Sequence, residues 1–308
     1  LVAFSGPDFK ATFDKQSGLL TSYLYKKHEY ILNGQGPRPF FWRAPTDNDY
    51  GANLPVRLKA WKEASYQEPK AESFQVTPGS NATTVKVTYR FPQTEARWNI
   101  TYKIYASGVI KVDNRFMAEG DQAPMIPRVG LRMQLPESFT DLTYYGRGPK
   151  ENYRDRRTSQ FIGEYAIPVK DMYEPYVRPQ ENNHRTDIYW CALTDKTQRG
   201  LLLIADRTFE LNASNYPLES MDSGDTIDNG APRTEKTHHR HLTDPLPEKM
   251  VDLFIDYRMM GVGGDDSWGA TAHEPYLIRP GKENAIEYGF SLVPFDKKED
   301  YKYLIQQY

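Results

Sequence analysis

The sequence has very little cysteine and no surplus of either charge. Its 308 residues contain one Cys, and 39 Lys and Arg stand against 41 Asp and Glu. A single thiol forms no internal disulfide, so the fold has to rest on packing alone. The near-neutral balance argues against a nucleic-acid-binding protein, because such a protein needs a basic surplus on one face.

Long apolar runs and long basic runs are also missing. No stretch approaches the ~18 consecutive apolar residues of a membrane helix, and no run of basic residues suggests binding to a membrane surface. The sequence does not begin with Met, so we expect a processed protein or a piece of a longer one. Its localisation, cytoplasmic or periplasmic, stays open.

Helical periodicity is nearly absent, and the dominant period is two. One short helix is predicted at 56–64, with Leu58, Trp61 and Ala64 on one face. Apolar residues instead alternate with polar ones in several runs, which is typical of half-buried antiparallel strands. The clearest such runs are 85–91, 98–105, 129–135 and 286–292. The pattern predicts an all-β protein, a large antiparallel β-sandwich that forms a single domain over residues 1–308.

Turn-forming residues separate the predicted strands at short spacing. Residues 106–108 (ASG) join 98–105 to 109–114, and residues 14–18 (DKQSG) join 10–13 to 19–25, as in β-hairpins. Four longer segments are poor in strand pattern and rich in Gly, Pro, Asn and Asp: 34–55, 136–155, 168–185 and 216–247. Long irregular loops in a compact fold are usually functional or form interfaces.

Neither the cysteine nor the histidine cluster predicts a reactive centre. Cys191 lies in an apolar run, which favours a buried strand thiol over a nucleophile. The cluster at 238–241 (HHRH) lacks the spacing of metal ligands and has an Arg in its middle, which opposes a cation. We therefore predict no metal site in this chain.

A glycine-rich loop at 261–269 (GVGGDDSWG) is the most distinctive irregular segment. Asp265 and Asp266 are a poor acid/base pair, because adjacent residues of an extended chain point in opposite directions. The glycines allow positive φ and a tight path, while Asp and Ser can bond the local backbone. Trp268 is then either held outward by a stiff loop or buried under a turn, and these two interpretations stay open.

Two further loops are dense in charged and turn-forming residues. Residues 43–51 (RAPTDNDYG) suit an Asx turn, with Asp47, Asn48 and Asp49 bonding the backbone and Gly51 as a hinge. A calcium loop is disfavoured there because the EF-hand glycine and distal Glu are missing. Residues 146–157 mix arginines with acids, which favours an Arg–carboxylate network that holds a long loop in place.

Six ordered motifs together make the chain resemble the C-terminal domain of family 2 β-galactosidases. They are 43–51 (RAPTDNDYG), 146–155 (GRGPKENYRD), 171–177 (DMYEPYV), 179–185 (PQENNHR), 239–242 (HRHL) and 260–268 (MGVGGDDSW). The hairpin FDKQSGLL at 13–20 is similar to the start of that domain. The resemblance implies a β-supersandwich of the galactose-mutarotase type, which agrees with the period-two pattern.

The resemblance also implies a role for individual residues. Trp268 would reach the neighbouring active site and stack on galactoside substrate. Gly51 would be the hinge of a mobile loop shaped by Asp47, Asn48 and Asp49, although Tyr50 and the residues after Gly51 diverge from the family pattern. Asp265 and Asp266 would shape the tryptophan loop.

The same resemblance places the catalytic glutamates outside this chain. They would lie in a preceding TIM barrel, so the chain would be inactive alone, without a cofactor of its own. The barrel would hold Mg²⁺ and Na⁺, and the full enzyme would form a homo-oligomer. Two alternatives remain: a stand-alone aldose 1-epimerase, for which His184, His241 and Glu181 could be nominated, and a carbohydrate-binding or structural module.

Overall fold

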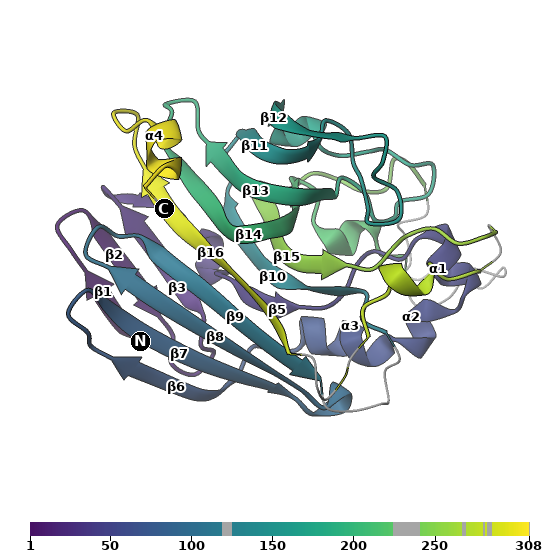
Figure 1. Cartoon of the computed structure of the whole chain (residues 1–308), viewed down its shortest axis with the longest axis horizontal. Coiled ribbons are helices and arrows are strands. Elements are labelled where there is room, and N and C mark those ends of the chain that lie inside the picture. The colour runs from purple at the N-terminus through teal and green to yellow at the C-terminus, as the bar shows by residue number, and fades with distance from the viewer. Residues whose placement is uncertain (119–124, 224–240, 267–268, 280, 282–284, 308) are drawn as a thin grey trace.

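Two antiparallel sheets make up most of the protein (Figure 1). The computed structural model describes residues 1–118, 125–223, 241–266, 269–279, 281 and 285–307. The small sheet has the strand order β1 (Val2–Ser5), β2 (Phe9–Phe13), β3 (Leu20–Tyr25) and β4 (His28–Glu29). The hairpin predicted around 14–18 is therefore confirmed as the β2–β3 connection.

The large sheet curls around the core and has a main path of nine strands among the described residues. In spatial order these are β12 (Phe161–Pro168), β11 (Asp141–Gly148), β13 (Arg185–Thr194), β14 (Gly200–Ser214), β16 (Ile286–Phe295), β9 (Ile110–Ala118), β8 (Ala96–Tyr105), β7 (Ala82–Phe91) and β6 (Ala71–Thr77). Three more strands, β5 (Arg38–Phe40), β10 (Arg128–Pro136) and β15 (Met250–Met259), leave this path as a branch. The predicted all-β class is confirmed.

The branch arises because the long strand β14 changes partner half-way along its length. Gly200–Ala205 pair with β16, whereas Glu210–Ser214 pair with β15. The residues between them, 206–209, pair with neither strand on that side. The sheet therefore divides at this point, and the division opens a space between β15 and β16.

Alternating strands supply the core, as the sequence pattern predicted. In β8, residues at every second position from Ala96 to Ile104 are buried and the intervening ones are half-buried. Aromatic side chains meet in this core: the ring centroid of Phe41 lies 5.0 Å from that of Trp61 and 5.5 Å from that of Trp98. Such aromatic contacts add to the stabilisation from area burial.

Short helices close one end of the structure (Figure 1). They are α1 (Asp47–Gly51), α2 (Leu54–Arg57) and α3 (Lys59–Tyr66), with α4 (Tyr301–Ile305) at the other end; single 3₁₀ turns lie at Leu32–Gly34, Pro92–Thr94, Val169–Asp171, Leu218–Met221 and Glu274–Tyr276. The predicted helix at 56–64 is confirmed in its buried face, since Leu58, Trp61 and Ala64 are all buried. It is divided, however, because Leu58 leaves helical geometry at φ −112° and ψ 18°.

Two predictions of irregular structure were wrong. The segment 136–155 contains strand β11, whose side chains alternate between exposed and buried positions despite its glycines. The segment 43–51 is not a simple Asx-turn loop, because Asp47–Gly51 form helix α1. The local bonds were nevertheless of the predicted kind: Asp49 and Thr46 form a capping box that starts the helix.

Candidate functional site

Arg43 ties two of the sequence motifs together at one end of the molecule. Its Nε and Nη2 donate to the two carboxylate oxygens of Asp49 at 3.0 and 2.8 Å. Its Nη1 donates to the carbonyl of Met260 at 2.7 Å, and Nη2 also donates to the carbonyl of Gly261 at 3.1 Å. Arg43 is buried. The start of the glycine-rich loop is therefore held directly against helix α1.

Asp155 binds the same glycine-rich loop from the other side. Its carboxylate accepts from the backbone N–H of Val262 at 3.1 Å and of Gly263 at 2.7 Å. A Cβ added to Gly261 would lie 2.6 Å from the Asp155 carboxylate. The expected positive φ is absent at positions 261, 263 and 264, so glycine is required there by close approach rather than by backbone conformation.

Glu151 and Asn152 connect the motif at 146–155 to the motif at 179–185. Glu151 accepts from the backbone N–H of Asn183 at 2.8 Å, from Arg156 at 2.6 Å and from the hydroxyl of Tyr176. Asn152 donates to two carbonyls of its own loop and accepts from Thr186. The predicted Arg–carboxylate network is thus confirmed, and neutral side chains complete it.

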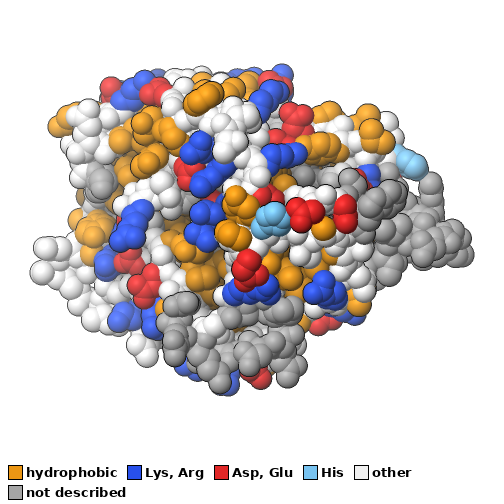
Figure 2. Space-filling view, turned by 45° about the vertical axis from the view of Figure 1, so that its right-hand side comes forward, with side chains coloured by type: hydrophobic (Ala, Val, Ile, Leu, Met, Phe, Trp, Pro, Cys, Tyr) orange, Lys and Arg blue, Asp and Glu red, His pale blue; other side chains and the backbone are white. Residues whose placement is uncertain are grey.

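These contacts gather motifs that are far apart in the sequence into one region, which we call the motif end. It comprises residues 43–51, 146–157, 176–185 and 260–266. Helix α1 of the motif end lies on the right of Figure 1, and Figure 2 brings that side forward. Basic and acidic side chains are interspersed over that face rather than gathered by sign. The described residues on that face therefore form no continuous positive surface of the kind that a nucleic-acid-binding site has.

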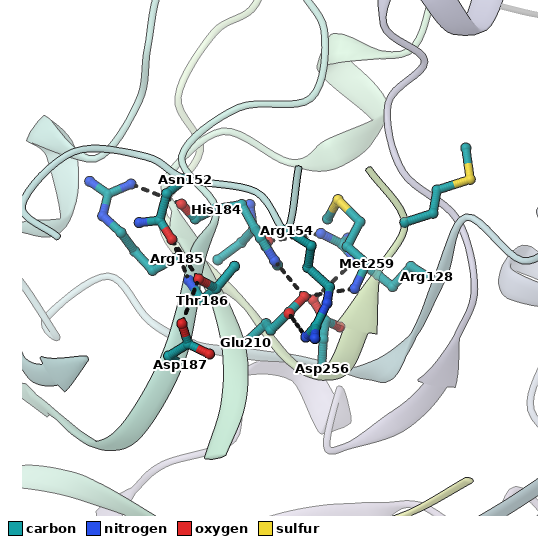
Figure 3. A network of polar contacts seen from close by, with 12 residues as sticks. Arg128, Asn152, Arg154, His184, Arg185, Thr186, Asp187, Glu210, Asp256 and Met259 are labelled. Atoms are coloured by element: carbon teal, nitrogen blue, oxygen red, sulfur yellow. Dashed lines mark hydrogen bonds and ion pairs between the residues drawn. The ribbon is translucent and has the colours of Figure 1, made fainter. Parts of the chain in front are cut away.

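A buried group of charges supports the motif end from beneath (Figure 3). His184 contacts Glu210 Oε2 through Nε2 at 3.0 Å and Asn212 Oδ1 through Nδ1 at 2.6 Å. Arg154 donates to the other Glu210 oxygen at 3.0 Å. Burial lowers the pKa of His184, but the Glu210 carboxylate more than offsets this, and the pKa is raised. Burial raises the pKa of Glu210, but His184 and Arg154 together outweigh burial, and the pKa is lowered.

Asp256 lies in the same group and has fewer polar contacts than Glu210. Arg128 Nε is 3.2 Å from its Oδ2, yet neither carboxylate oxygen has a well-directed hydrogen bond among the described residues. Complete burial raises the pKa of Asp256 to about 7, and Arg128 only partly opposes this. The carboxylate of Asp256 fits here only because residue 130 is glycine: a Cβ on Gly130 would lie 1.7 Å from Asp256 Oδ1.

An open pocket of about 350 Å³ lies at the surface of the motif end. Its lining is Thr46, Asp47, Asn48, Tyr153, Arg156, Tyr176, Gln180, Glu181 and Val262. Two of the predicted loop residues, Asp47 and Asn48, line it, whereas Asp49 faces Arg43 instead. Sequence reasoning did not single out Tyr153, Arg156 or Tyr176, although all three lie within the motif runs or directly after them.

The remaining predicted residues lie at the rim. Asp265 is exposed and 2.7 Å from His273 Nε2, and Asp266 accepts from the backbone N–H of Ala270 at 3.1 Å. Gly51 ends α1 and faces Gly269, where an added Cβ would come within 2.4 Å of the Gly51 carbonyl group. The two predicted loops therefore touch. Trp268, the predicted sugar contact, lies outside the described residues.

The three residues nominated for epimerase chemistry do not line a common pocket. His184 is fully buried with both ring nitrogens engaged, so no substrate reaches it. Glu181 lines the pocket, and its Oε1 accepts from Asn212. His241 is exposed and binds Asp244 through its backbone, while residues 238–240 lie outside the described part. Within the described residues, no group of three or more His, Cys, Asp or Glu could hold a metal ion.

The family described as beta galactosidase small chain matches residues 5–292 of the sequence. The chain belongs to this family. A β-galactosidase from Priestia megaterium is 34% identical over 89% of this chain and 25% of its own length. Another from Lactobacillus delbrueckii subsp. bulgaricus is 32% identical over 90% of this chain and 26% of its own length. The small chain thus spans about a quarter of these relatives.

A solved structure supports the fold independently of sequence. The galactose 1-epimerase from Lactobacillus acidophilus NCFM aligns with a TM-score of 0.51 and 7% identity, covering 96% of this chain and 93% of that chain. The predicted galactose-mutarotase-like supersandwich is confirmed, and at this identity the likeness concerns fold alone. In the described part of the small chain, none of the helices has the length and apolar character needed to cross a bilayer.

Proposed function

We propose that this small chain completes the galactoside-binding site of a β-galactosidase whose catalytic carboxylates lie elsewhere in the same polypeptide. The observation that carries the proposal is the convergence of separate motifs on one pocket, held together by Arg43 and Asp155. A chain that served only as a spacer would not need a buried Arg43 and a buried Asp49 to hold two loops beside the same surface pocket. Relatives about four times as long are named β-galactosidases.

In this proposal the reaction is a retaining double displacement with two carboxyl groups about 5–5.5 Å apart. Those groups and the Mg²⁺ and Na⁺ of the catalytic part lie outside the small chain. The small chain contributes Trp268 as an aromatic platform for a sugar ring. The contacts to Arg43 and Asp155 fix the position of the loop at 261–266. Asp265 and Asp266 are proposed to shape the turn that leads to Trp268.

The loop at 46–51 forms the second contribution. Asp47 and Asn48 line the pocket, while Asp49 holds the loop to Arg43. Gly51, packed against Gly269, is the proposed hinge at which this loop moves. On its own the small chain has one aromatic platform and a shaped rim but no catalytic carboxylate pair, so it is proposed to be inactive in hydrolysis.

The test is Trp268→Leu in the intact polypeptide, with kinetics on several galactosides. Loss of a stacking platform worth on the order of 1–2 kcal/mol should raise KM about tenfold. Phe161→Leu is the matched control, because Phe161 is an exposed aromatic on strand β12, outside the motif end, and its loss should leave KM unchanged. Unchanged kinetics in Trp268→Leu across all substrates would contradict the proposal.

A further inference from the structure

A cleft of about 1020 Å³ opens where the large sheet divides. Its walls come from both sides of the division: residues 206–208 of β14, the end of β15 at Tyr257 and Arg258, and the start of β16 at 286–289. The cleft and the pocket of the motif end share no lining residue. The cleft is therefore a second concave site, and the proposed galactoside contacts do not use it.

Hydroxyl and amide groups form the floor of this cleft. Alternation in β7 and β8 turns the apolar set inward, so the polar set is left facing the cleft. The floor residues are Thr88, Asn99 and Thr101 of these two strands, together with Ser73 and Gln75 of β6. Thr88 and Asn99 bond each other across the strands at 2.9 Å. A floor of this kind suits a ligand with many hydroxyl groups, since each side chain can both donate and accept.

The walls of the cleft carry more positive than negative charge. Six basic and four acidic residues line it: Lys86, Arg115, Arg154, Arg157, Arg207 and Arg258, against Asp113, Asp187, Asp206 and Glu287. Each acid already has a basic partner within 4 Å, as the following ion pairs show: Lys103–Asp113, Arg157–Asp187, Lys111–Asp206 and Arg115–Glu287. These pairs leave Arg207 and Arg258 of the cleft without an acidic partner among the described residues.

Arg258 is the most exceptional of these basic residues. Its Nε is buried without a hydrogen-bond partner, and no ion pair joins its guanidinium to any residue that the structure describes. It lies over the ring of Tyr257 at 5.2 Å. Burial, and then the nearby charge of Arg154, lower the pKa of Arg258, and Tyr257 and Glu210 only partly oppose this. A half-buried guanidinium among other guanidiniums is costly unless an anion binds there.

Arg207 adds a second free guanidinium at the same cleft. It is exposed on β14, and no described residue forms a hydrogen bond or ion pair with it. Guanidinium groups bind planar carboxylates through two parallel hydrogen bonds, and this pairing is stronger than one between neutral groups. Arg258 and Arg207 both line the cleft, so both guanidiniums face the same open space.

We propose that this cleft binds a sugar acid, with its carboxylate on Arg258 and Arg207 and its hydroxyls on the strand floor. The segment 153–157 connects this cleft to the motif end, because Tyr153 and Arg156 line the pocket there while Arg154 and Arg157 line the cleft. The ligand class differs from the neutral galactoside of the proposed function, so the two proposals can fail separately.

The experiment titrates the intact polypeptide with D-galacturonate at low salt and measures binding by calorimetry, with D-galactose and inorganic phosphate as comparison ligands. Removing one guanidinium from a charge-assisted pair should weaken galacturonate binding about tenfold in Arg258→Gln. Arg207→Gln is exposed and should fold normally, and we expect a smaller loss of severalfold. Arg90→Gln is the control, because Arg90 is an exposed strand arginine outside the cleft, and it should bind like the unchanged protein.

Selective galacturonate binding that both cleft variants weaken, with galactose unaffected by them, supports the proposal. Phosphate binding as tight as galacturonate would overturn it, because the cleft would then recognise charge without the sugar. Galacturonate binding that is absent, or equal in all variants, would overturn it as well. Hydrolytic activity on neutral galactosides is measured in parallel, and its retention in Arg258→Gln shows that a binding loss is local to the cleft.

Discussion

Replacing Arg43 by Met should separate the glycine-rich loop from helix α1. Arg43 makes two bonds to Asp49 and two to the carbonyls of residues 260 and 261. Only 2% of Arg43 and 6% of Asp49 is exposed, so the change leaves an uncompensated carboxylate in the interior. Breaking a buried ion pair in this way typically costs about 3–5 kcal/mol. That is a large part of the ~5–15 kcal/mol that stabilises an ordinary protein.

The second half of this prediction uses Asp49→Asn to isolate the pair. Asp49→Asn alone leaves Arg43 charged and buried, so it too should be strongly destabilising. In the double variant both charges are gone, and the loss should be smaller than the sum by about 2 kcal/mol, as expected for groups in direct contact. Arg90→Met is the control: its ion pair with Glu72 is 3.6 Å long and exposed, and such pairs contribute only about 0–1 kcal/mol.

Urea unfolding of the unchanged protein and of the four variants gives the free energies, and hydrogen exchange locates the effect. Amides of residues 260–263 should exchange faster in Arg43→Met, since one of the two anchors of that loop is lost. The reasoning is refuted if Arg43→Met costs less than about 1 kcal/mol, or if the two substitutions are simply additive. It is also refuted if exchange rises elsewhere but not in the glycine-rich loop.

Two further predictions concern buried titratable groups. The pKa of Asp256 is about 7 in the folded protein against about 3.9 in an unfolded chain, so the folded state binds the proton more tightly. Its contribution to stability is therefore lost as pH rises from about 4 to about 7. Because the two pKa values differ by about 3, the loss at pH 8 is on the order of 4 kcal/mol, and Asp256→Asn should remove it. Equal urea midpoint changes between pH 5 and pH 8 in both proteins would contradict this. Burial raises the pKa of the Cys191 thiol, so iodoacetamide should label it only after unfolding, and labelling of the native protein at the rate of a free thiol would show that the strand opens.

The strands were predictable because their information is local. An alternation such as that of 98–105 requires only that one face be buried, and β8 has that arrangement. Strand β11 was missed because Gly146 and Gly148 weaken the local pattern. Both glycines are required by side chains of neighbouring strands: a Cβ on Gly146 would meet Ile188 of β13 at 2.4 Å, and one on Gly148 would meet Tyr165 of β12 at 2.9 Å.

The candidate site was predictable as a set of motifs but not as an arrangement. The resemblance pointed to Asp49 as a loop-shaping residue, yet its partner Arg43 and the contacts of Arg43 to residues 260 and 261 connect positions more than 200 apart in the sequence. The glycines at 261–264 were expected to provide positive φ, and the structure shows that close approach by Asp155 and Ala270 is the reason instead.

The sequence by itself determined the fold class, the family motifs and the buried thiol, because each depends on a short pattern and on whether a face is apolar. Only the tertiary structure decided that β14 changes partners, that the sheet therefore opens into a charged cleft, and that Arg258 stands there without a partner among the described residues. Charge compensation depends on groups brought together from distant strands. No local pattern contains that information.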